Sequence, residues 1–176
     1  MSLCSFTEKV ELNAPIEKVF QYLSDTEQFE RVYPSLQPKV IRRTSRHLNQ
    51  GASTDLQLNL FGIPTSWKIY THSFNTNRHI ACIWHSKLVS TWEHDYYFES
   101  IANNQTRLTE CVLYRLPFGV FGTFLNRLFV RSYLQRIFKR RRKILISTFQ
   151  DHRRMESSSK RTSQEMFKIT RDHQRN

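Results

Sequence analysis

The sequence predicts one α+β domain in which a curved antiparallel sheet of about seven strands wraps around a long C-terminal helix. Between residues 38 and 116, six segments alternate apolar and polar side chains, and short turn signals separate them. After Pro117 the apolar period changes to 3.6 residues, which is typical of a helix. A sheet with one apolar face needs a cover, and no other segment is long enough, so we expect this helix to provide it.

The first predicted elements are a strand and two short helices. Residues 4–12 alternate apolar and polar side chains, which predicts the strand. Asn13 is placed to cap the helix that follows, and Pro15 suits its first turn. Thr26 is placed to cap a second short helix, which Pro34 ends. We therefore expect both helices to precede the main run of strands.

The remaining strands follow one another at hairpin spacing, which implies an antiparallel meander. Their segments are residues 38–46, 53–62, 65–74, 79–87, 90–100 and 107–116. The long helix is expected from residue 118 to about residue 155, and Gly119 and Gly122 weaken its first turns. We expect residues 1–155 to form the domain. Residues 156–176 are polar, and we expect them to form a mobile tail.

Positive charge is concentrated in the C-terminal part of the chain. Residues 1–126 carry a net charge of +1, whereas residues 127–176 carry +11. The run KRRRK at 139–143 sweeps more than one helical turn, so it cannot form a one-sided patch. Arg141 and Arg142 fall on or beside the apolar stripe of the helix, where their stems can lie along the surface while their charged ends stay in water. That stripe consists of Leu134, Phe138, Leu145 and Phe149. We interpret the run as a solvated helix end.

The charge distribution also bears on two possible partners, nucleic acid and anionic membranes. The nearly neutral body and the strands, which offer no basic and aromatic platform, argue against nucleic acid. A weak contact with anionic membranes through residues 127–155 has more support, because cations there accompany Phe129 and the phenylalanines just before it. A membrane-surface adaptor is therefore one alternative function.

The cysteines and the N-terminus predict a cytoplasmic protein. Cys4, Cys82 and Cys111 form no close pair, and their spacing with the histidines fits no zinc pattern, so we expect no metal and no cofactor. Reduced thiols fit the cytoplasm. Glu8 and Glu11 lie where a signal peptide would need an apolar core, and no apolar run reaches membrane-spanning length.

Five segments carry a recognisable pattern of residues. They are ELNAPIEKVFQYLSD (11–25), GIPTSW (62–67), WEHDYYF (92–98), ECVLYRLPFG (110–119) and RIFKRR (136–141). They resemble the helix-grip proteins of the SRPBCC superfamily, which includes START lipid-transfer domains and polyketide cyclases. The last four are similar to a bacterial ligand-binding subgroup, although Tyr96 stands where those relatives tend to have a second histidine and Glu110 where they tend to have aspartate. The resemblance implies a cavity between sheet and helix that binds a small hydrophobic or lipid-like ligand.

One strand face is the expected wall of that cavity. Alternate residues of a strand share a face, so Trp92, His94, Tyr96 and Phe98 point the same way. Ligand sites are mostly apolar with a few placed polar groups, which fits this set. The residues that we expect to contact the ligand are Trp67, Trp92, His94, Tyr96, Phe98, Glu110, Tyr114, Phe121 and Leu125.

The orientation of Glu110 depends on the register of the last hairpin. A three-residue loop sets His94 opposite Tyr114 and Phe98 opposite Glu110, and it turns Glu110 inward. A two-residue loop turns the alternate set inward instead. We prefer the first register because it gives the more apolar inner face. An inward carboxylate would need a hydrogen-bond donor.

Binding or transport of a ligand is the favoured function, and catalysis is the less favoured one. A cyclase- or hydratase-type enzyme would use His94 and Glu110 as acid and base. A general base needs a substrate proton within reach and usually an orienting partner. No nucleophile elbow, phosphate-binding loop or paired-carboxylate motif is present. We therefore assign no catalytic residue and expect a structural Glu110.

Overall fold

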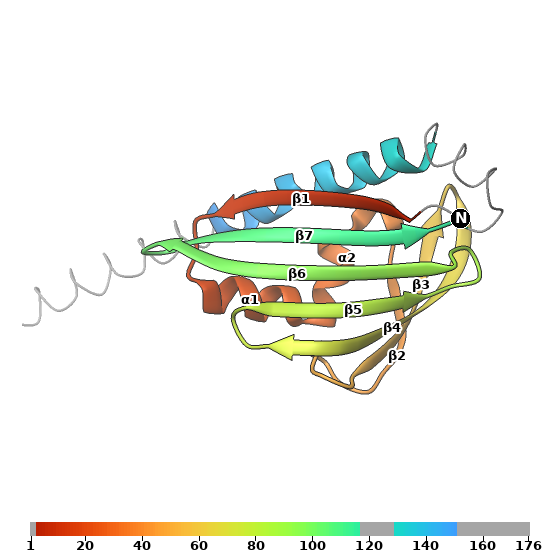
Figure 1. Cartoon of the computed structure of the whole chain (residues 1–176), viewed down its shortest axis with the longest axis horizontal. Coiled ribbons are helices and arrows are strands. Elements are labelled where there is room, and N and C mark those ends of the chain that lie inside the picture. Colours follow the sequence, from red (N-terminus) through yellow and green to blue (C-terminus); the bar gives the residue numbers. More distant parts are fainter. Residues whose placement is uncertain (1–2, 117–128, 151–176) are drawn as a thin grey trace, which may run out of the picture.

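The computed structural model describes residues 3–116 and 129–150 (Figure 1). The strands are β1 (Cys4–Leu12), β2 (Lys39–Arg43), β3 (Ser53–Leu60), β4 (Ile63–Asn75), β5 (His79–His85), β6 (Thr91–Ala102) and β7 (Gln105–Arg115). Between β1 and β2 lie α1 (Ile16–Ser24), η1 (Thr26–Gln28), α2 (Phe29–Val32) and η2 (Pro34–Leu36), of which η1 and η2 are short 3-10 turns. Residues 129–150 form the C-terminal helix.

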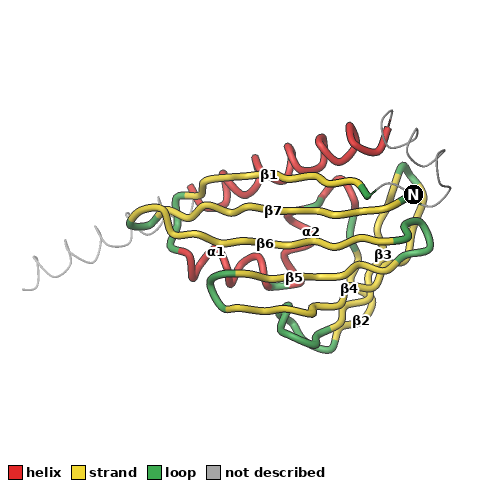
Figure 2. Tube along the Cα trace, in the orientation of Figure 1, coloured by secondary structure: helices red, strands yellow, loops and turns green. Residues whose placement is uncertain are grey.

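The strands form one antiparallel sheet in the order β1-β7-β6-β5-β4-β3-β2. Each strand from β2 to β6 pairs with the next one along the chain, and β7 also pairs with β1. Figure 2 shows the strands side by side as a single twisted layer. The predicted meander is confirmed, because the period-two alternation marks each strand and the short turns leave little choice of partner.

The helices lie together on one face of the sheet (Figures 1 and 2). The C-terminal helix turns one apolar stripe inward, as its period predicts. The buried apolar side chains of that stripe are Leu134, Ile137, Phe138, Leu145 and Phe149. The predicted α+β fold, with a long C-terminal helix gripped by the sheet, is therefore confirmed. None of the helices within the described ranges is long and apolar enough to cross a membrane.

Both predicted helix caps are wrong. The residue that precedes α1 is Pro15, and no side chain caps this helix; the side chain of Asn13 instead accepts a hydrogen bond from Gln105 on β7. The turn η1 is capped by Asp25, whose carboxylate accepts from the backbone N–H of Glu27. Thr26 donates its hydroxyl to the carbonyl of Arg46. Asn13 and Thr26 were both predicted to cap a helix, but each side chain instead hydrogen-bonds to a residue that is distant in the sequence.

The preferred register of the last hairpin is wrong by two residues, but the predicted orientation of Glu110 is correct. Tyr96 lies opposite Glu110, and His94 lies opposite Val112. The loop has two residues, and a bulge between Ser100 and Ala102 adds the extra residue that restores the predicted face. A shift of two residues keeps every side chain on the same side of a sheet, so Glu110 still points inward.

Several predictions concern residues outside the described ranges. They are the start of the long helix at 118–128 with Gly119 and Gly122, its end at 151–155, and the tail at 156–176. The expected ligand contacts Phe121 and Leu125 also lie outside these ranges. The division into a domain at 1–155 and a tail at 156–176 stays a prediction.

Candidate ligand-binding site

A cavity of about 530 Å³ lies between the sheet and the C-terminal helix. Its described lining residues are Tyr33, Leu36, Leu58, Leu60, Phe61, Ile63, Thr65, Trp67, Trp84, Leu88, Val89, Trp92, His94, Leu116, Phe129, Val130, Tyr133, Leu134, Ile137 and Phe138. None of these is Asp, Glu, Lys or Arg, and all except Thr65 and His94 are aliphatic or aromatic. The volume lies within the range of small-molecule sites.

Three tryptophans stand together in the wall of the cavity. Trp67, Trp84 and Trp92 come from the neighbouring strands β4, β5 and β6, and their ring centroids are 5.8 to 6.4 Å apart. They are all the tryptophans of the chain. Sequence reasoning missed Trp84, although it alternates with Ile80 and Cys82 along β5 and so shares their inward face.

The hydroxyl group of Thr65 already makes two hydrogen bonds within the wall of the cavity. Its hydroxyl donates to the carbonyl of Leu58 at 2.9 Å and accepts from the indole N–H of Trp67 at 2.9 Å. The residue is buried. This part of the wall therefore offers the cavity mainly carbon surface.

A buried polar chain runs from His94 away from the cavity to the C-terminal helix. The hydroxyl of Tyr96 lies 3.2 Å from Nδ1 of His94, and Nε2 of His94 lies 3.2 Å from Oε1 of Glu110. Arg141 donates to the other carboxylate oxygen of Glu110. An ionised carboxylate can only accept, so Nε2 of His94 carries the proton and Nδ1 accepts from Tyr96. Both ring nitrogens and both carboxylate oxygens are thus occupied.

Burial and charge fix the protonation of this chain. Burial alone would raise the pKa of Glu110, but the Arg141 guanidinium and the hydrogen bond from His94 outweigh burial and hold that pKa below 4.5. Burial lowers the pKa of His94 below 6.5 against the opposing effect of Glu110. Burial also raises the pKa of Tyr96. At neutral pH the chain therefore contains one anion, Glu110, one cation, Arg141, and a neutral imidazole.

The prediction that Arg141 keeps its charged end in water is wrong. Arg141 lies three residues after Phe138 and four before Leu145, so the helix turns it inward with the apolar stripe. Its guanidinium carbon lies 4.6 Å from the ring centroid of Tyr33 and 5.8 Å from that of Tyr96. The inward carboxylate of Glu110 and these two aromatic faces replace the lost water.

Two further donors on cavity-lining residues are buried. The indole N–H groups of Trp84 and Trp92 have no hydrogen-bond partner among the described residues. Buried polar groups are normally paired, and an unpaired one costs free energy. A ligand oxygen is one partner that would satisfy such a group.

Solved structures share this architecture. The aromatase/cyclase ZhuI from Streptomyces sp. R1128 has a TM-score of 0.68 at 14% identity, over 85% of this chain and 94% of that one. A START superfamily protein from Mycobacterium smegmatis has a TM-score of 0.65 at 14% identity, over 84% and 97%. Truncated norcoclaurine synthase from Thalictrum flavum has a TM-score of 0.62 at 10% identity, over 82% and 94%. The chain therefore has the same helix-grip fold as these proteins. No family model and no curated protein matches the sequence.

Within this helix-grip domain the expected ligand contacts divide into two groups. Trp67, Trp92 and His94 line the cavity. Four others lie behind or beside its wall. Tyr96 and Glu110 belong to the buried polar chain. Phe98 packs against Phe20 with ring centroids 5.0 Å apart, and Tyr114 packs against Trp92 with ring centroids 5.6 Å apart. The helix-grip sheet thus brings the predicted residues to one face, but only part of that face borders the cavity.

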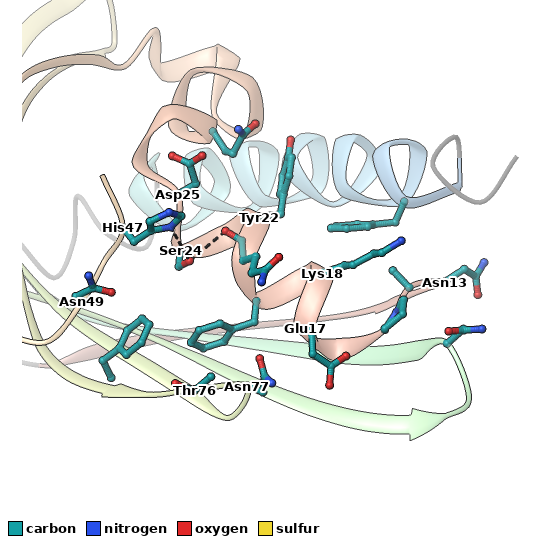
Figure 3. Close-up of a pocket in the computed structure, with 18 residues that line it drawn as sticks. Asn13, Glu17, Lys18, Tyr22, Ser24, Asp25, His47, Asn49, Thr76 and Asn77 are labelled. Carbon is teal, nitrogen blue, oxygen red and sulfur yellow. Dashed lines mark hydrogen bonds between the residues drawn. The ribbon is translucent and has the colours of Figure 1, made fainter. Parts of the chain in front are cut away.

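A second hollow, of about 910 Å³, lies at the end of the domain where α1 begins (Figure 3). It is more polar than the cavity, and Figure 3 shows Lys18, His47 and Asn49 at its sides. The hydroxyl of Ser24 donates to the carbonyl of Gln21 at 3.0 Å and lies 3.3 Å from Nδ1 of His47. Because that hydroxyl proton is already donated to a backbone carbonyl, Ser24 and His47 do not form a nucleophile–base pair.

The thiol nearest to the buried chain stays protonated. Cys82 lies opposite His94 in the β5–β6 pair, and its sulfur lies 3.6 Å from the hydroxyl of Thr71. Burial raises the pKa of Cys82 to about 12. Metal ligation requires the thiolate. Within the described ranges, no group of three or more His, Cys, Asp and Glu side chains is placed to hold a metal ion.

Proposed function

We propose that the protein binds a small, uncharged and predominantly apolar ligand in the cavity between the sheet and the C-terminal helix. The observation that carries this proposal is the wall itself, which combines the three tryptophans with aliphatic side chains and includes no charged residue among those described. Aromatic side chains provide large contact areas at little cost in conformational entropy. A ligand held here would be recognised mainly by shape and apolar contact.

The buried chain argues against a charged ligand. The ionic groups closest behind the wall, Glu110 and Arg141, already neutralise each other. A ligand carboxylate or ammonium group would therefore enter an apolar cavity without a counter-ion, which is costly. An uncharged oxygen, such as a carbonyl or hydroxyl group, would instead find unpaired donors on Trp84 and Trp92.

The acid–base alternative has less support from the same geometry. His94 and Glu110 do form a hydrogen-bonded pair at 3.2 Å, as such an enzyme would require. However, Tyr96 donates to the only ring nitrogen that could accept a substrate proton, and Arg141 holds the carboxylate. Glu110 does not border the cavity. We therefore assign both residues to the structure of the wall.

A matched pair of ligands tests this proposal. Methyl naphthoate and the naphthoate anion have the same ring system and differ in charge. We expect the ester to bind at least about tenfold more tightly in equilibrium dialysis, because the anion would lose its hydration without gaining a partner. The variant His94→Gln should retain ester binding. Equal or tighter binding of the anion, or no binding of either compound, would contradict the proposal.

A further inference from the structure

Exposed apolar side chains gather around the entrance of the cavity. Phe61, Ile63, Leu88 and Phe129 line the cavity and yet expose 61%, 65%, 46% and 59% of their surfaces. We call these four side chains the mouth rim. They come from the β3–β4 hairpin tip, the β5–β6 connection and the first described turn of the C-terminal helix. Figure 1 shows the hairpin tip and the first described turn of that helix at the same end of the molecule.

The backbone holds one rim residue in an unusual conformation. Phe61 and Gly62 form the two-residue loop between the paired residues Leu60 and Ile63, and their φ angles are +53° and +84°. Two-residue hairpin loops with positive φ favour asparagine, aspartate and glycine at both positions. A bulky residue there costs conformational energy, and such positions cluster at functional sites. The ring of Phe61 stacks on Tyr133 with centroids 4.1 Å apart, which fixes it at the entrance.

The chain segments that line this end of the cavity are also basic in sequence. Four segments contribute to the lining at this end: residues 60–65, 85–92, 113–116 and 129–137. They contain no Asp or Glu. Their cations are Lys87, Arg115, Arg131 and Arg136. Lys87 is exposed and directly precedes the rim residue Leu88, and Arg131 is exposed on the side of the helix that faces β1, half a turn after Phe129.

We propose that the mouth rim docks on an anionic lipid bilayer, with its apolar side chains in the interface and its cations on lipid phosphates. Exposed apolar patches rimmed by charge mark interaction sites, and this combination suits the headgroup region of a membrane. Among the described residues, the apolar cavity reaches the surface at this rim. A docked protein would therefore exchange its ligand with the bilayer without exposing it to water, a consequence that rests on the proposed function.

A bilayer fits the rim better than an acidic protein does. The rim side chains surround the entrance from three separate segments, so a protein partner seated on all of them would cover the opening. A fluid bilayer can accept the same side chains and leave the route to the cavity apolar. The rest of the C-terminal helix adds exposed cations at Lys139, Arg140, Arg142 and Lys143, and residues 129–150 include no acidic residue.

Co-sedimentation with lipid vesicles tests this proposal. We expect the full chain to sediment with vesicles of phosphatidylcholine and phosphatidylserine, and to do so far less with phosphatidylcholine alone. Ile63→Ser should weaken this binding about tenfold, because it removes apolar area from the interface. Its control is Ile41→Ser on β2, which removes an isoleucine that is 61% exposed and is not part of the cavity lining; this variant should bind as the wild type does.

A second pair of variants tests the charge. Arg131→Gln should weaken binding to the anionic vesicles about fivefold. Arg78→Gln removes the same charge from an exposed residue in the β4–β5 turn, at the opposite end of β4 from the rim, and should have no effect. Wild-type protein that stays in the supernatant with both vesicle types, as it would if the rim bound an acidic protein, would overturn the proposal. Equal losses in the rim variants and their controls would also overturn it.

Ligand binding is measured separately, so that the two proposals can fail independently. Uptake of methyl naphthoate by the wild type in vesicle-free buffer reports on the cavity alone. Sedimentation of ligand-free protein reports on docking alone. Uptake without sedimentation contradicts only the docking proposal, and sedimentation without uptake contradicts only the proposed function.

Discussion

Arg141 of the C-terminal helix donates a hydrogen bond to Glu110 of β7 inside the protein, where the two side chains expose only 2% and 3% of their surfaces. This pair fastens the helix to β7, which lies next to the edge strand β1. It also supports His94, whose ring borders the cavity. The pair therefore links the stability of the fold to the shape of the candidate site.

Removing one member of this pair should be strongly destabilising. Arg141→Met leaves the carboxylate of Glu110 buried without its counter-ion, which costs about 3–5 kcal/mol in the free energy of unfolding. Arg142→Met is the matched control, because Arg142 is the next residue, has 51% of its side chain exposed and meets Glu8 only at 3.5 Å. It should change stability by less than about 0.5 kcal/mol. Urea denaturation measures both, and similar losses would contradict the assignment.

The two members of the pair should also depend on each other. Glu110→Gln combined with Arg141→Met removes both charges and leaves a carbonyl oxygen to accept from His94. The double variant should therefore lose less stability than the two single variants together, with a coupling of about 2 kcal/mol or more. Additive losses in this double-mutant cycle would mean that the two side chains do not interact in the folded protein.

Stability should fall as the medium becomes acidic, in two steps. The pKa of His94 is below 6.5 in the folded state, so the unfolded chain takes up a proton first, and stability is lost as pH falls from 6.5 through the folded pKa. Glu110 has its pKa below 4.5 and contributes a second loss as pH falls below that value. Each group adds a slope of at most about 1.4 kcal/mol per pH unit.

The variant His94→Gln separates these two steps. It should flatten the loss that begins below pH 6.5 and keep the loss that begins below pH 4.5. Urea denaturation at a series of pH values gives both slopes. An unchanged slope below pH 6.5 in the variant would show that His94 is not buried in its neutral form.

Trp92 and Phe98 should differ in their effects although they share one face of β6. Trp92 borders the cavity, so Trp92→Ala should cost less than about 3 kcal/mol of stability and should weaken ligand binding at least about tenfold. Phe98 packs in the core against Phe20, so Phe98→Ala should cost about 3–5 kcal/mol and leave ligand affinity unchanged. Thermal unfolding measures the stability of each variant, and equilibrium dialysis measures its ligand affinity. If Phe98→Ala weakened ligand binding and Trp92→Ala did not, the ligand would contact β6 near Phe98 and not near Trp92.

Much of the fold could be predicted from the sequence because local patterns specify it. Alternation along residues 4–12 and across the later strands marks which side chains face the helix, and this face includes Trp67, Trp92 and His94. The inward direction of Glu110 follows from the same alternation. The bulge between Ser100 and Ala102 has no such local signal, so the register was predicted two residues away from the one that forms.

The parts of the site that could not be predicted depend on contacts between distant segments. Arg141 belongs to a run of cations that suggested solvent, and its burial depends on Glu110, which lies 31 residues earlier on another element. Tyr33 and Trp84 reach the cavity only because the residues before β2 and the strand β5 converge there. The helical periodicity placed Arg141 beside the inner stripe. It gave no sign of Glu110, the partner that makes the burial of Arg141 possible.

Tryptophan fluorescence gives the most direct test of the central claim, that the cavity admits an apolar ligand. All three tryptophans of the chain line the cavity, so a ligand bound there should change the intrinsic signal. Titration with N-phenylnaphthylamine, an uncharged fluorescent ligand, should quench the tryptophans and increase the ligand's own emission, with saturation at one ligand per chain. A cooperatively folded protein whose tryptophan emission stays constant throughout the titration would contradict the claim and leave only the fold.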